Sequence, residues 1–479
     1  MTFAYIMKQV FLFISVLSFL FLKGQAQKEW TFKECVEQAL KNNISLNQAD
    51  LSNQQNLINV KQAKANLIPT LNLSDGQGLN FGRTVDPFTN QFVNQNINTN
   101  NIAATTSVTI FSGMQNINTV RQSKLNYDAG NLDVAKMKND IALNVAVAYL
   151  QVLFAYEQFE IAKKQLESTQ EQLHKTELFL KVGKMTETNL LQIQSQLSSD
   201  KLTVTNAENQ LSISKLTLMQ LMEIPINKEF EIQKPSNEVL ATVYPNIEEI
   251  YGTALENQPQ VKSSQIKTMS SLVGYQVAKG GLMPKLFLAG SLKSGYSSAR
   301  KLTTYSQVIQ QQNIGYLQSN PSEAVVGFIP TTVPVNADYP AGKQFVDNFG
   351  QSISINLTVP IFNNLSVKSN MDKAKLNIEN AKFNENAVKN QLRKAVEQAY
   401  IDVVSANKKY IASQEQVESE ERTYFTLQKQ FDVGLANAID YVIEKNNYAK
   451  AILGLVQAKY DYIFKMKVLD FYQGKDLTL

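Results

Sequence analysis

The sequence predicts a mainly helical, internally duplicated fold in which long helical hairpins are joined to a few short strands. Residue patterns recur at two constant spacings, two stretches of nearly 70 residues contain no proline or other convincing break, and short segments alternate between aliphatic and polar residues. Repeats at a fixed spacing indicate tandem structural copies. Unbroken stretches of this length indicate helices far longer than the three or four turns usual in globular proteins.

The duplication is defined by spacings of 215 and 251 residues. The first relates Ala39-Leu40 to Ala254-Leu255, Ala63-Lys64 to Ala278-Lys279, and Leu67, Pro69, Leu71 and Leu73 to Leu282, Pro284, Leu286 and Leu288. The second relates Ile110-Phe111 to Ile361-Phe362, Lys124-Leu125-Asn126 to Lys375-Leu376-Asn377, Tyr149 to Tyr400, and Val182-Gly183 to Val433-Gly434. The second copy therefore carries an insertion of about 36 residues between Leu288 and Ile361, and we expect a surface loop there, from about Tyr296 to Asn348.

Residues 1–26 are typical of a secretory signal peptide. Lys8 precedes an apolar run from Val10 to Leu22, and Gly24-Gln25-Ala26 supplies the small residues of a cleavage site. The run is too short for a spanning helix, although an uncut signal anchor is the alternative. After Ala26 no stretch approaches 18 consecutive apolar residues, so we expect no membrane helix.

Composition excludes several functional classes. Without Lys8 and Lys23 the chain has 44 basic and 42 acidic residues, and this balance argues against a nucleic-acid partner, which requires a basic face. Cys35 is the only cysteine, so either the mature protein is stabilised by packing alone or Cys35 bonds another chain. A secreted helical chain of this kind is expected in the periplasm or the outer membrane.

Each copy is predicted to run helix, strand, loop, strand, very long helix, turn and helix. The first copy covers residues 27–224, a linker with three prolines covers 225–246, the second copy covers 247–473, and 474–479 form a short tail. The opening helix is expected from Thr31 to Ile68, where Pro69 ends it. A polar loop rich in Gly and Asn is expected from Asp75 to Asn101.

Four short strands are predicted, two in each copy. Alternation at 70–74 and 102–110 recurs most clearly at 352–361, where Ile353, Ile355 and Leu357 face away from Ser352 and Ser354. This pattern fits a half-buried strand of a soluble sheet, and it also fits a strand with lipid on one side and water on the other. Four strands are too few to close a barrel within one chain.

The two long helices are predicted from Gly113 to Val182 and from Asn364 to Val433, each on the order of 100 Å. Both carry a seam of small and apolar residues with the 3.5-residue period of a coiled coil. The seam of the first is Ile141, Val145, Ala148, Val152, Ala155, Phe159, Ala162, Leu166, Thr169, Leu173, Thr176 and Leu180. The seam of the second is Leu392, Val396, Ala399, Val403, Ala406, Tyr410, Ser413, Val417, Glu420, Tyr424, Leu427 and Phe431.

Each long helix ends at Val-Gly, and glycine is the usual residue just past a helix end. Return helices are expected from Thr186 to Met222 and from Asn437 to Tyr472, which makes two helical hairpins with Val-Gly tips. A free-standing filamentous coiled coil is the alternative, but it leaves the strands, the duplication and the paired turns unexplained.

These features together resemble the TolC family of outer-membrane efflux proteins, from Trp30 to about Tyr472. The resemblance rests on the signal peptide, the opening helix with Ala39-Leu40, the helix-Pro-strand junctions at Pro69 and Pro284, and the paired Val-Gly tips. It implies a homotrimer in which four strands from each chain form one 12-stranded barrel in outer-membrane lipid, continued by a helical tunnel into the periplasm. It also implies passive conduction from an inner-membrane pump through a periplasmic adaptor (membrane fusion) protein.

The resemblance also implies site residues. Asp440 matches a position at which the family carries a pore-facing aspartate at the tunnel entrance. A second aspartate of the family falls at Ile443, with Glu444 next to it, so Asp440 and Glu444 are the candidate residues of the pore entrance. The matching residue of the first copy is Asn189. An ordinary solvated acid is the alternative for Asp440. The hairpin tips are candidates for adaptor docking, or are simply turns: Val182, Gly183, Lys184, Val433, Gly434 and Leu435.

No residues argue for catalysis. His174 is the only histidine and lies on a long helix, so with one His and one Cys no transition-metal cluster can form within one chain. We expect no enzyme activity and no cofactor. Two alternatives to an efflux duct stay open: the outer-membrane component of a type I protein secretion system, and a trimeric surface protein with a coiled-coil stalk.

Overall fold

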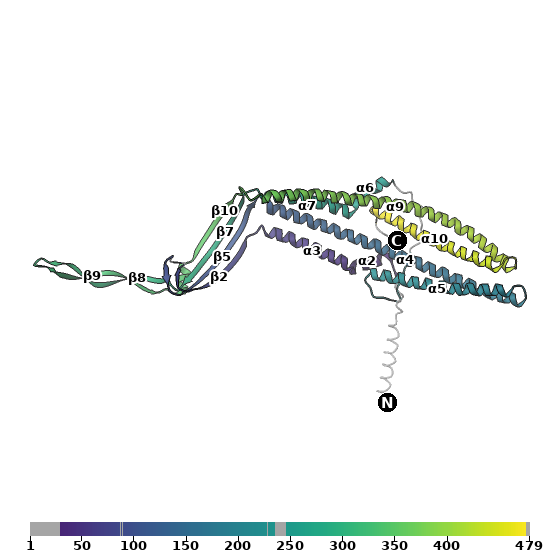
Figure 1. Ribbon diagram of the computed structural model, residues 1–479, viewed down its shortest axis with the longest axis horizontal. Coiled ribbons are helices and arrows are strands. Elements are labelled where there is room, and N and C mark those ends of the chain that lie inside the picture. The colour runs from purple at the N-terminus through teal and green to yellow at the C-terminus, as the bar shows by residue number, and fades with distance from the viewer. Residues whose placement is uncertain (1–28, 87, 89, 228, 235–245, 476–479) are drawn as a thin grey trace, which may run out of the picture. The chain divides into compact units, whose positions relative to one another are not determined.

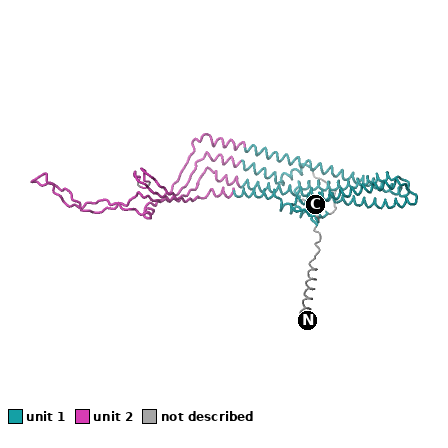
Figure 2. The backbone as a smooth tube through the Cα atoms, turned by 60° about the horizontal axis from the view of Figure 1, so that its bottom comes forward, with its two compact units in different colours: residues 1–58, 124–271, 377–479 teal, residues 59–123, 272–376 magenta. Residues whose placement is uncertain are grey.

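The computed structural model describes residues 29–86, 88, 90–227, 229–234 and 246–475 (Figure 1). These residues divide into two compact units (Figure 2). Among the described residues, unit 1 takes those within 29–58, 124–271 and 377–475, and unit 2 takes those within 59–123 and 272–376. The predicted signal peptide, residues 235–245 of the predicted linker and residues 476–479 of the predicted tail lie outside the described residues.

Four pairs of helices have equal lengths in the two copies, which confirms the predicted duplication. The opening helices have 11 and 22 residues in each copy, the long helices 67, and the return helices 35. In chain order they are α2 (Phe32–Asn42), α3 (Ile44–Ala65), α4 (Gln115–Lys181) and α5 (Glu187–Leu221), then α6 (Ile247–Asn257), α7 (Pro259–Gly280), α9 (Ser366–Asp432) and α10 (Ala438–Tyr472).

The prediction of one continuous opening helix is wrong, because each copy has a break. Asn43 leaves the helical conformation with a ψ of 118°, and its side-chain Oδ1 accepts a hydrogen bond from the Leu46 N–H that starts the next helix. In the second copy Gln258 has a ψ of 124° and is followed by Pro259, which disfavours a helical preceding residue. The first copy lacks that proline, so the sequence gives less indication of the helix break at Asn43.

The core of unit 1 follows the predicted seams. Each of the twelve positions in each seam is buried or half-buried, and Val152 and Val403 are completely buried. The first seam packs against α2, α5 and α10, and the second against α6 and α10. Cys35 is also completely buried in the first core, as expected if packing alone accounts for it. By length and composition alone, one described helix, α4, could cross a membrane, and 44% of its most apolar 18-residue window is buried within the chain.

The four predicted strands form one antiparallel sheet in unit 2, in the order β10-β7-β5-β2. Two of them are longer than expected, because part of the predicted loop from Asp75 to Asn101 is strand. There, paired amides replace the aliphatic alternation: Gln77 Nε2 donates to Asn98 Oδ1 at 2.6 Å, and Asn100 Nδ2 donates to Asp75 Oδ1 at 2.8 Å. The strands are β2 (Thr70–Asn80), β5 (Ile97–Ser112), β7 (Lys285–Ser297) and β10 (Gly350–Thr358).

Three smaller pieces of structure complete the fold. In unit 1, β6 (Glu231–Ile232) of the predicted linker pairs in parallel with β1 (Glu29–Trp30). In unit 2, β3 (Arg83–Val85) pairs with β4 (Phe92–Asn94). The inserted segment, predicted as a loop from Tyr296 to Asn348, is instead an ordered β-ribbon followed by a short helix: β8 (Lys301–Leu317), β9 (Asn320–Asp338) and α8 (Ala341–Asp347).

The junction between β5 and α4 requires glycine. Gly113 has a φ of +62°, and a Cβ there would lie 2.4 Å from the carbonyl oxygen of Gly280 at the end of α7. We predict that Gly113→Ala lowers the free energy of unfolding by about 2–4 kcal/mol, from left-handed backbone strain and overpacking together. Gly252→Ala in α6 is the matched control, since a Cβ there meets nothing within 4 Å. Thermal unfolding in detergent measures both, and equal stabilities would contradict this account.

Candidate functional site

Both long helices end in the same glycine turn. Gly183 and Gly434 have φ angles of +74° and +82°. In the first turn the Gly183 N–H donates to Leu180 O at 3.0 Å and the Lys184 N–H donates to Phe179 O at 2.9 Å. The second turn repeats both bonds, from Gly434 and Leu435. This pattern satisfies the last carbonyl groups of each long helix and reverses the chain.

The tips expose apolar side chains and are joined by a small shared core. Leu435 is 81% exposed, and Val182 and Val433 are also exposed. Behind them one cluster combines both hairpins: Ile193 from α5, Phe431 from α9, and Ala438 and Tyr441 from α10. The six predicted docking residues therefore lie on two turns that a common core holds together.

Asp440 lies in the first turn of α10 and is exposed. Its backbone N–H donates to the Asn437 side chain at 2.8 Å, so Asn437 caps the helix at the turn that carries Asp440. In the first copy Asn189 has the same place, and its N–H donates to the Thr186 hydroxyl at 3.3 Å. The two copies thus carry an acid and an amide at equivalent positions of their return helices. That either side chain faces a pore stays a prediction.

Glu444 lies one turn further along α10 and differs from Asp440 in its surroundings. Its side chain is buried, 9% exposed. Burial raises the pKa of the Glu444 carboxyl, and the neighbouring Glu420 carboxyl raises it further. The Glu444 side chain is thus buried where the Asp440 side chain is exposed, and a place at the pore entrance stays a prediction for Glu444.

A buried polar network behind the tips joins α10 to the first hairpin. Lys445 Nζ donates to the Thr169 hydroxyl on α4 at 2.6 Å, and that hydroxyl in turn donates to the Asp200 carboxylate on α5. Gln196 Nε2 donates to the other Asp200 oxygen at 2.7 Å and exchanges hydrogen bonds with the Asn446 amide. Burial lowers the pKa of the Lys445 ammonium to about 8, while Asp200 and Glu171 oppose the shift.

Sequence reasoning missed this network. Thr169 was assigned to the seam, but its partners come from other helices and from the other copy. A signal was present in the spacing: Lys445 follows the buried Ala438 and Tyr441 on the apolar face of α10. A lysine at such a position requires a buried acceptor or acid nearby.

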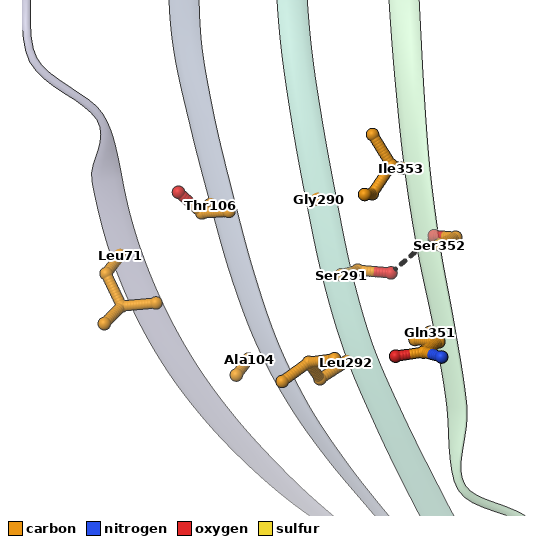
Figure 3. A pocket seen from close by; sticks show the side chains of 9 residues that line it. All are labelled: Leu71, Ala104, Thr106, Gly290, Ser291, Leu292, Gln351, Ser352 and Ile353. Atoms are coloured by element: carbon orange, nitrogen blue, oxygen red, sulfur yellow. Dashed lines mark hydrogen bonds between the residues drawn. The ribbon is translucent and has the colours of Figure 1, made fainter.

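The four-stranded sheet has two chemically different faces. The registers place aliphatic residues of neighbouring strands in rows on one face and hydroxyl and amide side chains on the other. Figure 3 shows part of it, where the Ser291 and Ser352 hydroxyls are hydrogen-bonded at 2.9 Å. Residues of the first kind are Leu71, Leu73, Val108, Leu288, Leu292, Ile353, Ile355 and Leu357. Residues of the second kind are Thr70, Asn72, Ser74, Thr105, Ser107, Ser291, Ser352, Ser354 and Asn356.

Metal chemistry finds no support in the part of the chain that the structure describes. There, no group of three or more His, Cys, Asp and Glu side chains is placed to hold a metal ion. His174 is exposed on α4. The features that stand out are the tips, the acid beside them, the buried network and the two-faced sheet.

Solved structures with the same fold are outer-membrane channels. The chain resembles CusC, whose crystal structures concern folding and transmembrane channel formation, with a TM-score of 0.73, 16% identity, and 93% and 92% of the two chains covered. It resembles the CmeC outer membrane channel of Campylobacter jejuni with a TM-score of 0.70, 20% identity, and 92% and 85% covered. It resembles the outer membrane protein VceC of Vibrio cholerae with a TM-score of 0.72, 13% identity, and 93% and 96% of the two chains covered. No curated protein sequence matches the chain significantly.

The duplicated helical hairpins and the four-stranded sheet of this chain thus have the fold of solved outer-membrane channels. The profile of the outer membrane efflux protein family matches residues 35–222 and 335–471, which is more than half of the chain. The chain belongs to that family. The family is one of outer-membrane efflux channels, so the place of this protein is the outer membrane.

The buried lysine gives a pH-dependent prediction. The pKa of Lys445 is about 8 in the folded protein and 10.5 ordinarily, so between these values the unfolded chain binds more protons. Stability from this group therefore rises with pH across that window. We predict that the melting temperature of wild type rises relative to Lys445→Met between pH 7.5 and 10, measured by thermal unfolding in detergent. If the melting temperatures of the two proteins changed with pH in parallel, the pKa of Lys445 would not be lowered in the folded protein.

Proposed function

We propose that three copies of this chain form the outer-membrane duct of a tripartite efflux system. The duct conducts substrates passively from an inner-membrane pump and a periplasmic adaptor protein to the outside. The observation that carries the proposal is the sheet of unit 2, which has one aliphatic face, one polar face and two unpaired edges. The same chain carries helices of 67 residues, long enough for a tunnel of about 100 Å.

The faces of the sheet suit a barrel wall in a membrane. Leu71, Ile353 and Ile355 point from one face and are more than 60% exposed in the single chain. Lipid is the environment that stabilises such a face, while a water-filled lumen suits the serine, threonine and asparagine side chains opposite. The strands have 9 to 16 residues, and a membrane strand needs about 9–11.

The edges of the sheet suit closure between chains. β2 and β10 are the outer strands, and neighbouring strands are antiparallel throughout. β10 of one chain can therefore pair with β2 of the next in the same antiparallel sense. Unpaired backbone groups cannot persist in lipid, so only a closed ring satisfies both edges. Three chains supply twelve strands to such a ring.

The two hairpin tips are the surface that we propose for the adaptor. They expose Val182, Val433 and Leu435 on turns whose backbone has no covering side chain at Gly183 and Gly434. Exposed apolar side chains mark a contact surface where they form a contiguous patch, and we propose that the two tips together form one. The pump selects the cargo, so the tips need only recognise the adaptor.

Two neighbouring residues of β2 test the barrel. A lysine at a lipid-facing position costs about 2–4 kcal/mol near the middle of the membrane. We therefore predict that Leu71→Lys reduces the yield of assembled trimer, whereas Asn72→Lys on the opposite face leaves assembly intact and changes conductance. Light scattering in detergent measures assembly, and planar bilayer recordings measure conductance. A monodisperse monomer, or a trimer that conducts no ions, would rule out the duct and favour a structural surface protein.

Asp440 tests the entrance. We propose that three Asp440 carboxylates form a ring at the tunnel entrance, where they attract cations. Asp440→Asn should then weaken cation selectivity and reduce block by multivalent cations, while the trimer stays stable. Glu444→Gln is the matched control, because that carboxyl is buried, and it should leave selectivity unchanged. Unchanged selectivity in single-channel recordings of Asp440→Asn would leave Asp440 as an ordinary solvated acid in the first turn of α10.

A further inference from the structure

The ribbon of β8 and β9 stands apart from the rest of unit 2. Its strands have 17 and 19 residues and, among the residues that the structure describes, pair only with each other. Figures 1 and 2 show the ribbon projecting beyond the four-stranded sheet. A strand of 17 residues spans about 55 Å. A two-stranded ribbon of this kind is marginally stable in water unless another surface packs against it.

The ribbon is apolar and nearly uncharged. Tyr305, Ile309 and Phe328 are 74%, 71% and 74% exposed. The register Ile309↔Pro330 and Gln311↔Phe328 places these three side chains on one face. No charged residue occurs from 302 to 322, and the base is closed by the Lys301–Asp338 ion pair at 2.6 Å. The strand edges are thus not protected by the charges that natural proteins usually place there.

The two edges of the ribbon differ because β9 contains prolines. Pro334 lies opposite Tyr305, and Pro330 lies opposite Ile309, with no register shift between them. Proline cannot donate to the ladder, so both nitrogens must point to the outer edge of β9. In an antiparallel pair these are the positions whose backbone groups face away from the partner strand. The outer edge of β9 is therefore interrupted twice and cannot accept another strand.

The outer edge of β8 is complete. Tyr305 and Ile309 lie opposite the two prolines, in pairs whose backbone groups point away from the partner strand. Every second residue of β8 therefore directs its N–H and C=O groups to the outer edge. β8 has no proline, so its outer edge offers an unbroken row of donors and acceptors. The residues of this row are Thr303, Tyr305, Gln307, Ile309 and Gln311. The protein protects one edge of the ribbon and leaves the other open.

We propose that the outer edge of β8 pairs antiparallel with β8 of a second copy of this chain, about a two-fold axis at Gln307. The strand is self-complementary in this register. Each Tyr305 lies opposite the partner's Ile309, an aromatic and β-branched pair that stabilises sheets. Gln307 lies opposite the partner's Gln307, where the two amides can bond, and Thr303 lies opposite the partner's Gln311. No charge opposes another.

The chemistry of the ribbon favours a second copy over a different partner. An uncharged edge offers no charge pattern for selecting another protein, whereas a two-fold pairing needs only one strand that complements itself. Such a contact joins chains in twos. If the chain assembles in threes, as the proposed function holds, the pairing links separate assemblies through their ribbons.

Cysteine cross-linking of the full-length protein tests the pairing. In the proposed register the two Gln307 Cα atoms form a hydrogen-bonded pair about 5.5 Å apart, which is within disulfide range. Gln307→Cys should form a disulfide-linked pair of chains under oxidation. Thr332→Cys is the matched control, because Thr332 lies directly opposite Gln307 on the proline-bearing strand, and it should form none. Wild type controls for Cys35, which is buried.

Particle size gives an independent reading. Ile309→Pro removes an outward N–H opposite Pro330, so it should leave the ribbon intact and abolish the larger, paired particle seen by light scattering. Light scattering of the protein under reducing conditions measures the assembly that forms without the disulfide. A trimer that does not pair would contradict the proposed pairing and leave the proposed duct unaffected. Equal cross-linking of Gln307→Cys and Thr332→Cys, no cross-linking of either, or a disulfide to a protein of different mass would each overturn the pairing.

Discussion

Lateral packing of the two 67-residue helices through their seams is the constraint on which the rest of the structure depends. An isolated helix gains little from propensity, and a rod of this length persists only if one stripe is buried along it. Val152 and Val403, at matching positions, are completely buried, and alanines on either side let the neighbouring helices approach closely. The ends of these seams fix where the glycine turns occur, and so where the exposed tips and their helix caps lie.

Much of this architecture could be predicted from the sequence, because its signals are local and repeated. The long helices end within two residues of their predicted limits, since glycine turns and capping residues such as Asn437 act on their immediate neighbours. The break at Asn43 had no proline to reveal it. The strand between Asp75 and Asn80 was missed because side-chain amides rather than aliphatic residues pair across it. The ribbon was recognised only as extra length, since prolines usually argue against a strand.

The site divides in the same way. The glycine turns and the position of Asp440 follow from residues adjacent in the sequence. The burial of Glu444 beside Glu420 depends on how two helices face each other, and the Lys445 network depends on how one hairpin packs on the other. That network also defines the register between hairpins. If one hairpin slid past the other by one helical turn, Lys445 and Asp200 would be buried without partners, which costs free energy. Apolar seam residues impose no such cost, because one can replace another.

Equal helix lengths in the two copies have a consequence for how the protein can vary. Residues 189 and 440 occupy matching helix starts on frames of identical length, yet one is an amide and the other an acid. In a ring built from such chains, each chain contributes two nearly equivalent backbone units. The backbone of the ring therefore has nearly twice the rotational symmetry of its side chains. Mutation can therefore adjust charge at every second position around the ring without disturbing the frame. Gene duplication has in this way separated the geometry of the wall from its electrostatics, so that each can evolve alone.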